Sequence, residues 1–293
     1  MKPGDPAPVW EQGEFRIGDR IAPVLEYDSG SDGWTNGLTT FHEESAGSSH
    51  FIDRASREYA LRQLLKHVRE ESPVILEVGC SSGFMIRLIR QHLPHAIIMG
   101  SDVVSEPLKR LAASMPGIPL VEFDLVRCPL PDGIFDALVL LNVLEHIDDD
   151  QAAVEQVHRV LKYGGVALIE VPAGPHLYDV YDKMLLHRRR YRLSELTVLL
   201  ENAGFKIMRK SHLGFFLYPG FWAVKKRNKR LFSIDKTTIQ QVVEQNIRDT
   251  GNSRILNIVM RIESFLGRWI SYPFGIRSLL TCVKPLQTKE GVA

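Results

Sequence analysis

The stretch from residue 73 to residue 172 alternates short apolar segments with amphipathic ones. The apolar segments predict buried strands, and the segments between them carry apolar side chains at helical spacing. Short apolar strands that alternate with helices are typical of a parallel sheet covered by helices on both faces. The pattern therefore predicts a doubly wound α/β fold whose first strands lie at residues 74–78, 96–102, 119–124, 135–143 and 166–172.

Amphipathic segments before and within this series predict helices with defined ends. Residues 52–71 predict a helix ahead of the first strand, because their apolar side chains recur on one face. Residues 151–165 predict another, and Gly164-Gly165 at its end would supply the left-handed stop that glycine makes cheaply.

The two ends of the chain depart from this alternation. Residues 1–50 are rich in Gly, Pro, Ser and acidic residues and predict an irregular leader, whose stretch 34–42 could cover an active site. Two further strands are predicted at 206–213 and 277–285, and residues 214–272 form a helical insertion between them.

Composition excludes several classes of protein. With 293 residues, 44% apolar side chains and a formal net charge of +1, the chain is typical of a soluble globular protein, and no nucleic-acid partner is expected. Its three cysteines, Cys80, Cys128 and Cys282, lie far apart, which argues against a disulfide framework and for a reducing compartment. No signal peptide or membrane span is recognisable, so a cytoplasmic protein is expected.

Polar residues follow the apolar runs at successive strand ends. The first strand leads into "EVGCSSG" at 77–83, and the next three end at Asp102, Asp124 and Asn142. In a doubly wound sheet the carboxyl ends of the strands bind the ligand. A carboxylate at position 102 can accept the hydrogen bonds of ribose hydroxyls, and one at position 124 can accept from an exocyclic amine. The four strand ends together predict a nucleoside-containing ligand.

The loop at 77–83 does not suit a dinucleotide. A dinucleotide fold would show GxGxxG, whereas this loop has GxxxG, with the acidic Glu77 before its first glycine. A carboxylate near a diphosphate is repulsive, but it is compatible with a ligand that carries an amino group and no phosphate. S-adenosylmethionine is therefore favoured over NAD, and a nicotinamide oxidoreductase remains the less favoured alternative.

These motifs resemble those of the class I S-adenosylmethionine-dependent methyltransferases. "VILEVGCSSG" is similar to the family's first motif, and "VEFDLVRCPLPDGIFDALVLLNVLEHIDD" to its third and fourth. The resemblance implies a Rossmann-like seven-stranded sheet of order 3-2-1-4-5-7-6 with an antiparallel last strand, built from residues 51–213 and 273–286. It also implies cofactor contacts from Glu77, Gly79, Cys80, Ser81, Gly83, Phe84, Asp102, Val103, Asp124, Leu125 and Asn142.

Ser81 departs from the family pattern, which usually has glycine there. Serine is tolerated at this position if its φ is negative, because its Cβ then meets no backbone clash. A negative φ at Ser81 is therefore expected.

Three residues are candidates for chemistry. His146 follows the fourth strand and is either a general base or a packing residue, and His187 and Tyr191 are secondary candidates for contacting the acceptor. "NVLEH" also resembles the ExxEH metal motif of two methyltransferase groups, but Asn142 replaces the first acid. Loss of an anionic ligand weakens a site for Mg²⁺ or Mn²⁺, so no metal is expected.

Two basic segments point to the acceptor and to partners. "HRRRYR" contains Arg188, Arg189 and Arg190, which would bind an anionic acceptor unless they form a solvated turn. Residues 214–230 join aromatic side chains to a basic cluster, which suits peripheral contact with an anionic membrane, a lid or the interface of a homodimer.

The sequence as a whole predicts a methyltransferase that uses S-adenosylmethionine and acts by in-line transfer. Its acceptor is expected to be a small molecule or a glycan- or lipid-linked intermediate, because the resemblance extends to bacterial methyltransferases of polysaccharide and secondary-metabolite pathways. A non-catalytic module that binds an adenosyl ligand for a partner enzyme is the main alternative.

Overall fold

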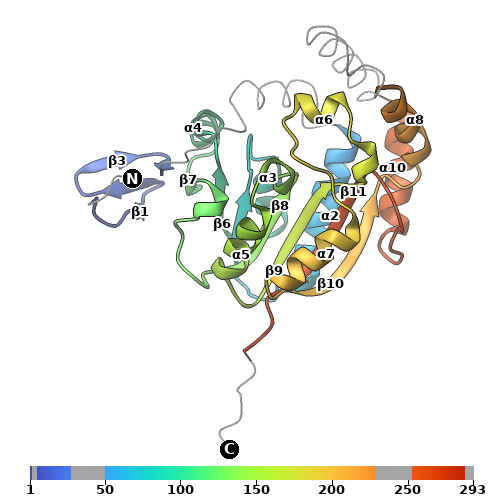
Figure 1. The fold of residues 1–293 in the computed structure, drawn as a ribbon. Helices are drawn as coiled ribbons and strands as arrows, with labels where there is room; N and C mark the ends of the chain where they lie inside the picture. The colour runs from blue at the N-terminus through green and yellow to red at the C-terminus, as the bar shows by residue number, and fades with distance from the viewer. Residues whose placement is uncertain (2–4, 28–49, 229–252, 288–293) are drawn as a thin grey trace, which may run out of the picture.

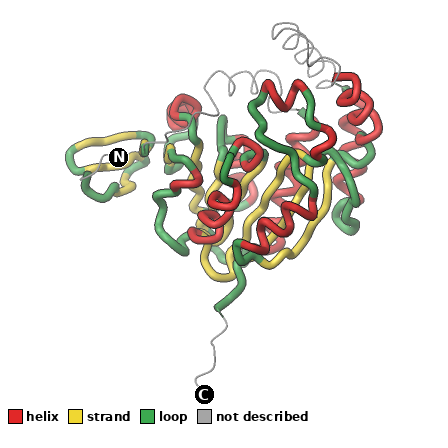
Figure 2. The backbone as a smooth tube through the Cα atoms, in the orientation of Figure 1, coloured by secondary structure: helices red, strands yellow, loops and turns green. Residues whose placement is uncertain are grey.

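A central sheet with helices on both sides forms the body of the protein (Figures 1 and 2). The computed structural model describes residue 1 and residues 5–27, 50–228 and 253–287. The strands of the main sheet are β4 (Leu25–Glu26), β5 (Val74–Val78), β6 (Ile97–Asp102), β7 (Leu120–Glu122), β8 (Phe135–Leu141), β9 (Leu161–Pro172), β10 (Lys206–Leu213) and β11 (Arg277–Val283). The α-helices are α2 (Phe51–His67), α3 (Phe84–His92), α4 (Ser105–Ser114), α5 (Asp150–Val160), α6 (Val180–Met184), α7 (Leu193–Asn202), α8 (Tyr218–Asn228) and α10 (Arg254–Leu266).

The strand order confirms the predicted topology. The main sheet runs β10-β11-β9-β8-β5-β6-β7-β4, and its first seven members reproduce the predicted order. The last strand, β11, is antiparallel to both of its neighbours, while β5 to β9 pair in parallel. The eighth strand, β4, was not predicted and pairs in parallel with the outer edge of β7.

Residues 9–26 differ from the irregular leader expected from their composition. They form β4 and a small three-stranded sheet of β1 (Val9–Glu11), β2 (Glu14–Ile17) and β3 (Arg20–Ala22), which projects at the left of Figure 1. Strands this short give too few alternations to stand out from a turn-rich sequence. The stretch 34–42, expected as a cover for the site, lies outside the described residues.

Alternate side chains of the sheet enter two apolar cores. On one face, Leu138 and Leu140 of β8 pack in a core with α5 and α7. On the other face, Ala137 and Val139 pack in a core with α2, α3 and α4. Because successive side chains of a strand point to opposite faces, a strand buried on both sides has the continuous apolar run seen in the sequence.

Helix α5 ends four residues before the glycine pair that was expected to stop it. The carbonyls of Arg159 and Val160 accept hydrogen bonds from the N–H groups of Gly133 and Ile134, and Leu161 already pairs with Phe135 of β8. The backbone leaves the helix because β8 offers these hydrogen bonds, so Gly164 and Gly165 lie inside β9.

The insertion between β10 and β11 contains α8 and α10, and α10 packs on α2 through a core that includes Phe51, Tyr59 and Met260. Apolar side chains at helical spacing also predict a helix at 237–247, which lies outside the described residues. None of the described helices combines the length and the apolar character that a membrane span requires.

A network of ion pairs joins the start of β11 to α2. The guanidinium of Arg277, at the start of β11, donates to the carboxylates of Asp53 and Glu170 and to the hydroxyl of Ser56, with N–O distances of 2.7 Å to Glu170 and 2.8 Å to Ser56. Glu170 also accepts from the side-chain amide of Asn142 at 3.0 Å. Arg277 therefore pairs with the fully buried carboxylate of Glu170 and the partly buried carboxylate of Asp53.

Replacement of this arginine tests how much the network stabilises the fold. We expect Arg277→Leu to lower the free energy of unfolding by about 3–5 kcal/mol, because it removes the ion-pair partner of the fully buried Glu170. Urea denaturation measures the change. Arg261→Leu, on the exposed side of α10, is the matched control and should stay within about 0.5 kcal/mol of wild type. A loss below about 1 kcal/mol for Arg277→Leu would contradict the assignment.

Candidate active site

The carboxyl ends of the parallel strands surround a cavity of about 980 Å³. Loops that follow β5, β6, β7, β8 and β9 line it, and α8, α10 and the start of α2 complete the wall. The predicted site residues among its lining are Gly79, Ser81, Asp102, Val103, Asp124, Leu125, Asn142, His146, His187, Arg188 and Arg190. The fold thus brings together predicted site residues from five separate segments of the sequence.

The loop after β5 turns sharply because two of its glycines have left-handed backbones. Gly79 has φ +73°, and a Cβ there would lie 2.7 Å from a methyl group of Val143 in the loop after β8. Gly83 has φ +71° and a Cβ there would lie 2.7 Å from Leu111 of α4. These close approaches explain why the two positions are glycine.

Ser81 contradicts the negative φ expected from its side chain, because its φ is +44°. Its N–H donates to the Asp102 carboxylate at 3.0 Å, and the other carboxylate oxygen of Asp102 accepts from the N–H of Val104 at 3.2 Å. The hydrogen bond to Asp102 holds the loop in the left-handed conformation. Serine is retained here at a backbone cost that glycine would not have.

The other acidic and amide positions also shape their own loops. Asp124 accepts from the N–H of Val126 at 3.0 Å and so caps the 3₁₀-helix η1 (Leu125–Arg127). Asn142 has a left-handed φ of +56°, and both its backbone and its side-chain amide donate to Glu170. Both residues nevertheless line the cavity, and their contacts with a cofactor stay predictions.

Glu77 tests whether the site fits S-adenosylmethionine. It is buried behind the loop, and burial raises the pKa of its carboxyl to about 8, opposed by the hydrogen bond from Ile86 N–H. Its Oε2 has no hydrogen-bond partner within the described part of the chain. A ligand ammonium group placed against this carboxyl would favour its ionised form, whereas a phosphate would disfavour it. The residues present therefore fit S-adenosylmethionine better than a dinucleotide.

Four predicted cofactor residues do not line the cavity. Cys80 is fully buried, and burial raises the pKa of its thiol. Gly83 begins α3, and the ring of Phe84 lies 5.3 Å from the guanidinium carbon of Arg57. Glu77 also stands behind the lining, so these four positions shape the loop from beneath.

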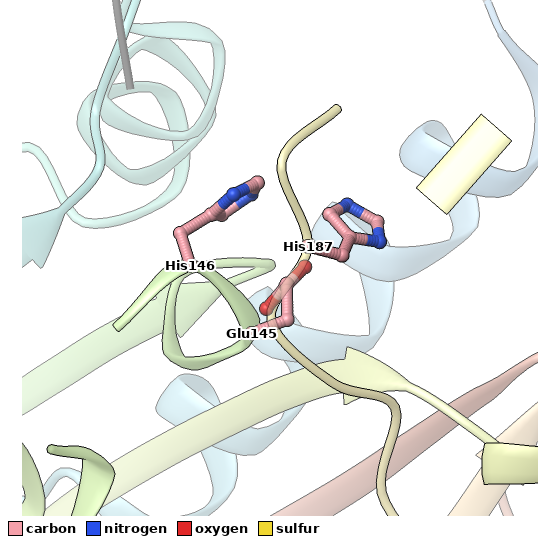
Figure 3. Close-up of side chains that lie close together, drawn as sticks. All are labelled: Glu145, His146 and His187. Carbon is pink, nitrogen blue, oxygen red and sulfur yellow. The ribbon is translucent and has the colours of Figure 1, made fainter. Parts of the chain in front are cut away.

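His146 and His187 come together although 40 positions separate them, and their rings lie 4.9 Å apart (Figure 3). His187 Nδ1 lies 2.8 Å from Asp182, and burial lowers the pKa of this imidazole although the hydrogen bond to Asp182 opposes the shift. Glu145, which was not singled out from the sequence, lies close to both histidines and is 0% exposed. Its position next to His146 inside "NVLEH" is the sequence feature that could have identified it.

Tyr191 and two of the arginines are engaged in internal contacts. The hydroxyl of Tyr191 donates to Asp150 at 2.7 Å, and the ring is buried outside the cavity lining. Arg189 pairs with Asp150 at 2.8 Å, and Arg190 pairs with the buried Asp182 at 2.7 Å. Arg188 is the half-exposed member and pairs with the exposed Asp148 at 3.2 Å. Roles for these residues in acceptor binding stay predictions.

Lys225 is buried, although the sequence predicts a surface position for it. Lys225 of α8, expected in a surface basic cluster, lies in the core of the wall and its Nζ is 2.6 Å from Asp179 and 2.8 Å from Asp182. Burial alone would raise the pKa of the Asp182 carboxyl, but the hydrogen bond from His187 and the charges of Arg190 and Lys225 hold it below its ordinary value. The insertion is thereby connected to His187 through Asp182.

Comparison with known proteins supports this arrangement. Residues 76–169 match the family described as "Methyltransferase domain". The chain is 32% identical over 171 residues to a protein named as a probable S-adenosylmethionine-dependent methyltransferase of Mycolicibacterium smegmatis, covering 58% of this chain and 64% of that protein. It is 28% identical over 122 residues to demethylmenaquinone methyltransferase of Thermus thermophilus, covering 38% and 56%.

A solved structure has the same fold. Phosphoethanolamine N-methyltransferase 2 of Haemonchus contortus, in complex with S-adenosyl-L-methionine, superimposes with a TM-score of 0.54 at 17% identity, covering 84% of this chain and 56% of that one. This likeness shows that the two chains share a fold. In sequence the chain is similar to S-adenosylmethionine-dependent methyltransferases, and it spans less than two thirds of the length of the curated relatives named above.

The backbone of Ser81 generates a prediction about stability and binding. Ser81→Gly should raise the free energy of unfolding by about 1 kcal/mol, because glycine adopts a left-handed φ without the cost that Cβ imposes. Its affinity for S-adenosylhomocysteine should stay near wild type, since the N–H that bonds Asp102 is retained. Urea denaturation and calorimetry measure the two effects.

The neighbouring Ser82 provides the control, because its φ is not left-handed. Ser82→Gly should lower the free energy of unfolding by about 0.5–1 kcal/mol. If Ser81→Gly were destabilised to the same extent, or lost most of its affinity, the side chain of Ser81 would have a direct role.

Proposed function

We propose that this protein transfers the methyl group of S-adenosylmethionine to a small-molecule or lipid- or glycan-linked acceptor by in-line displacement. The observation that supports the proposal best is the single cavity in which the Gly79 loop, Asp102, Asp124 and Asn142 meet the His146–His187 pair. The cofactor supplies an electrophilic methyl group on a sulfonium. The protein's part is to hold the acceptor in line with it and to exclude water.

The wall of the cavity supports an acceptor with an apolar portion. The insertion and the start of α2 contribute a group of apolar side chains that faces the loops of the sheet; these are Phe51, Ile52, Phe216, Leu217, Phe221, Val224 and Leu256. The relative from Thermus thermophilus is named for demethylmenaquinone, a substrate with such a portion. Arg188, half-exposed at the same cavity, is the residue that we propose for an anionic group of the acceptor.

Binding measurements test the cofactor first. Calorimetry should detect binding of S-adenosylhomocysteine and no binding of NAD. Asp102→Ala should weaken S-adenosylhomocysteine about 10–100-fold, because it removes a charged acceptor and releases the Ser81 loop. Glu122→Ala, at the end of the adjacent strand and outside the cavity, is the control and should bind normally. Heat with NAD and none with S-adenosylhomocysteine would overturn the proposal.

Methyl release then separates an enzyme from a binding module. A screen of isoprenoid quinols, phosphorylated sugars, carboxylates and phenols should find at least one class that accepts labelled methyl groups. Binding of S-adenosylhomocysteine without transfer to any class would favour the non-catalytic alternative.

We also propose a peripheral membrane contact through the insertion that includes residues 214–230, centred on the outer face of α10. Ile255 of α10 is 73% exposed, and Trp269, in the turn that follows the helix, is 68% exposed. Ile258, Ile262 and Phe265 of α10 are about half-exposed. Arg254, Arg261 and Arg268 are exposed beside them. The helix's one acid, Glu263, is buried and accepts from the N–H groups of Gly214 and Phe216. Apolar and cationic side chains without an exposed carboxylate suit an anionic lipid surface.

Vesicle sedimentation tests this contact. The protein should bind vesicles that contain phosphatidylglycerol, less so at high salt, and the double variant Ile258→Ser/Trp269→Ser should bind at least about 10-fold more weakly. Val198→Ser, an exposed apolar position on α7, is the control. If the double variant instead abolished dimer formation in sedimentation velocity and wild type ignored vesicles, the face would be a homodimer interface.

A further inference from the structure

We propose that Glu145, His146 and His187 bind a divalent transition-metal ion in the wall of the cavity (Figure 3). Resting on the proposed function, we further infer that this ion binds a hydroxyl oxygen of the methyl acceptor. The first statement concerns the protein alone and is tested without any acceptor.

The burial of the Glu145 carboxylate and its lack of hydrogen bonds to other described residues indicate that this position binds a cation. The side chain is 0% exposed, and neither of its carboxylate oxygens forms a hydrogen bond to another residue in the described ranges. Arg277 and Arg190, whose charges act on Glu145, already pair with Glu170 and Asp182. A buried carboxylate without a partner is costly, and such groups in proteins are paired or coordinate metals.

His187 has the support that metal-binding imidazoles usually have. Its Nδ1–H points to the Asp182 carboxylate at 2.8 Å, so the neutral ring carries its lone pair on Nε2. Asp182 is in turn held by Arg190 at 2.7 Å and Lys225 at 2.8 Å, which keeps it ionised and fixed in place. A carboxylate behind a ligating histidine sets its tautomer and orients its ring.

The positions of the three residues suit a common ion. Each offers one ligand atom, and these atoms all lie within 4.8 Å of one another. Metal–ligand bonds of about 2.0–2.2 Å allow ligand atoms up to about 4.2 Å apart, so small side-chain rotations complete the site. Figure 3 shows the Glu145 side chain below the two imidazoles, with Glu145 and His146 on the 3₁₀-helix η2 (Leu144–His146) and His187 on a separate loop.

The donor set selects the metal. Two imidazoles and one carboxylate favour Zn²⁺, Fe²⁺, Co²⁺ or Mn²⁺ over Mg²⁺ and Ca²⁺, which prefer oxygen ligands. The sequence argued against a metal because position 142 lacks an acid. In the structure the amide of Asn142 donates to Glu170, and the third ligand is His187, from a distant part of the chain.

Three protein ligands leave coordination positions open, and all three residues line the cavity. A metal ion there would lower the pKa of a bound acceptor hydroxyl, whose proton passes to water. The oxygen's electron pair then forms the new C–O bond, and the pair of the breaking C–S bond stays on sulfur. The ion would thereby remove the need for His146 to act as a general base.

Metal binding is tested on the untagged full chain after dialysis against a chelator. Calorimetry should show a single equivalent of Zn²⁺ bound, and Co²⁺ should give visible d–d absorption. Glu145→Gln and His187→Ala should each weaken the metal affinity by at least about 100-fold. Loss of a residue that only hydrogen-bonds to a metal ligand weakens the affinity less. His176→Ala, an exposed histidine outside the cavity, should bind like wild type. All variants should keep their affinity for S-adenosylhomocysteine, which shows that they are folded.

The possible outcomes separate the two proposals. Wild type that binds S-adenosylhomocysteine but no Zn²⁺ or Co²⁺ would overturn the metal site and leave the proposed function standing. Unchanged metal affinity in Glu145→Gln would overturn it as well. Metal binding with no affinity for S-adenosylhomocysteine would support the site and count against the proposed function.

Discussion

The reversal of strand order between β5 and β8 is the constraint on which the rest of the structure depends. The chain builds the sheet outward through β6 and β7 and then returns beside β5, so the loops after β5 and β8 leave the same edge side by side. The contact between Gly79 and Val143 shows how tightly these two loops pack. The cavity lies at this edge because helices cover the faces of the sheet and leave the strand ends open.

Buried charge pairs join α8 to the loop before α7 on one side of the cavity. Asp182 accepts from His187 and Arg190 of the loop before α7 and from Lys225 of α8. A set of buried charges of both signs tolerates little displacement, because each member that moves leaves another uncompensated. The orientation of His187 therefore depends on a helix that is remote in sequence.

Much of the fold could be predicted because buried parallel strands leave continuous apolar runs in the sequence. Details set by tertiary contacts could not. The end of α5 depends on hydrogen bonds offered by Gly133 and Ile134, and the φ of Ser81 depends on Asp102. At the site, motif residues at strand ends were predictable from local sequence. The meeting of Glu145 with His187 was not, because no local pattern relates two loops that close against each other only in the folded chain.

The burial of Lys225 limits the substitutions that homologous sequences can accept at this position. Its ammonium group neutralises Asp179, which is completely buried and also bonded by Asn228. A chain that loses the lysine must therefore lose or neutralise that acid in the same evolutionary step or soon after it. Among homologues, the residues at positions 179 and 225 should change together, although Asp179 precedes α6 and Lys225 lies on α8. Homologues that keep both residues should share this form of the cavity wall.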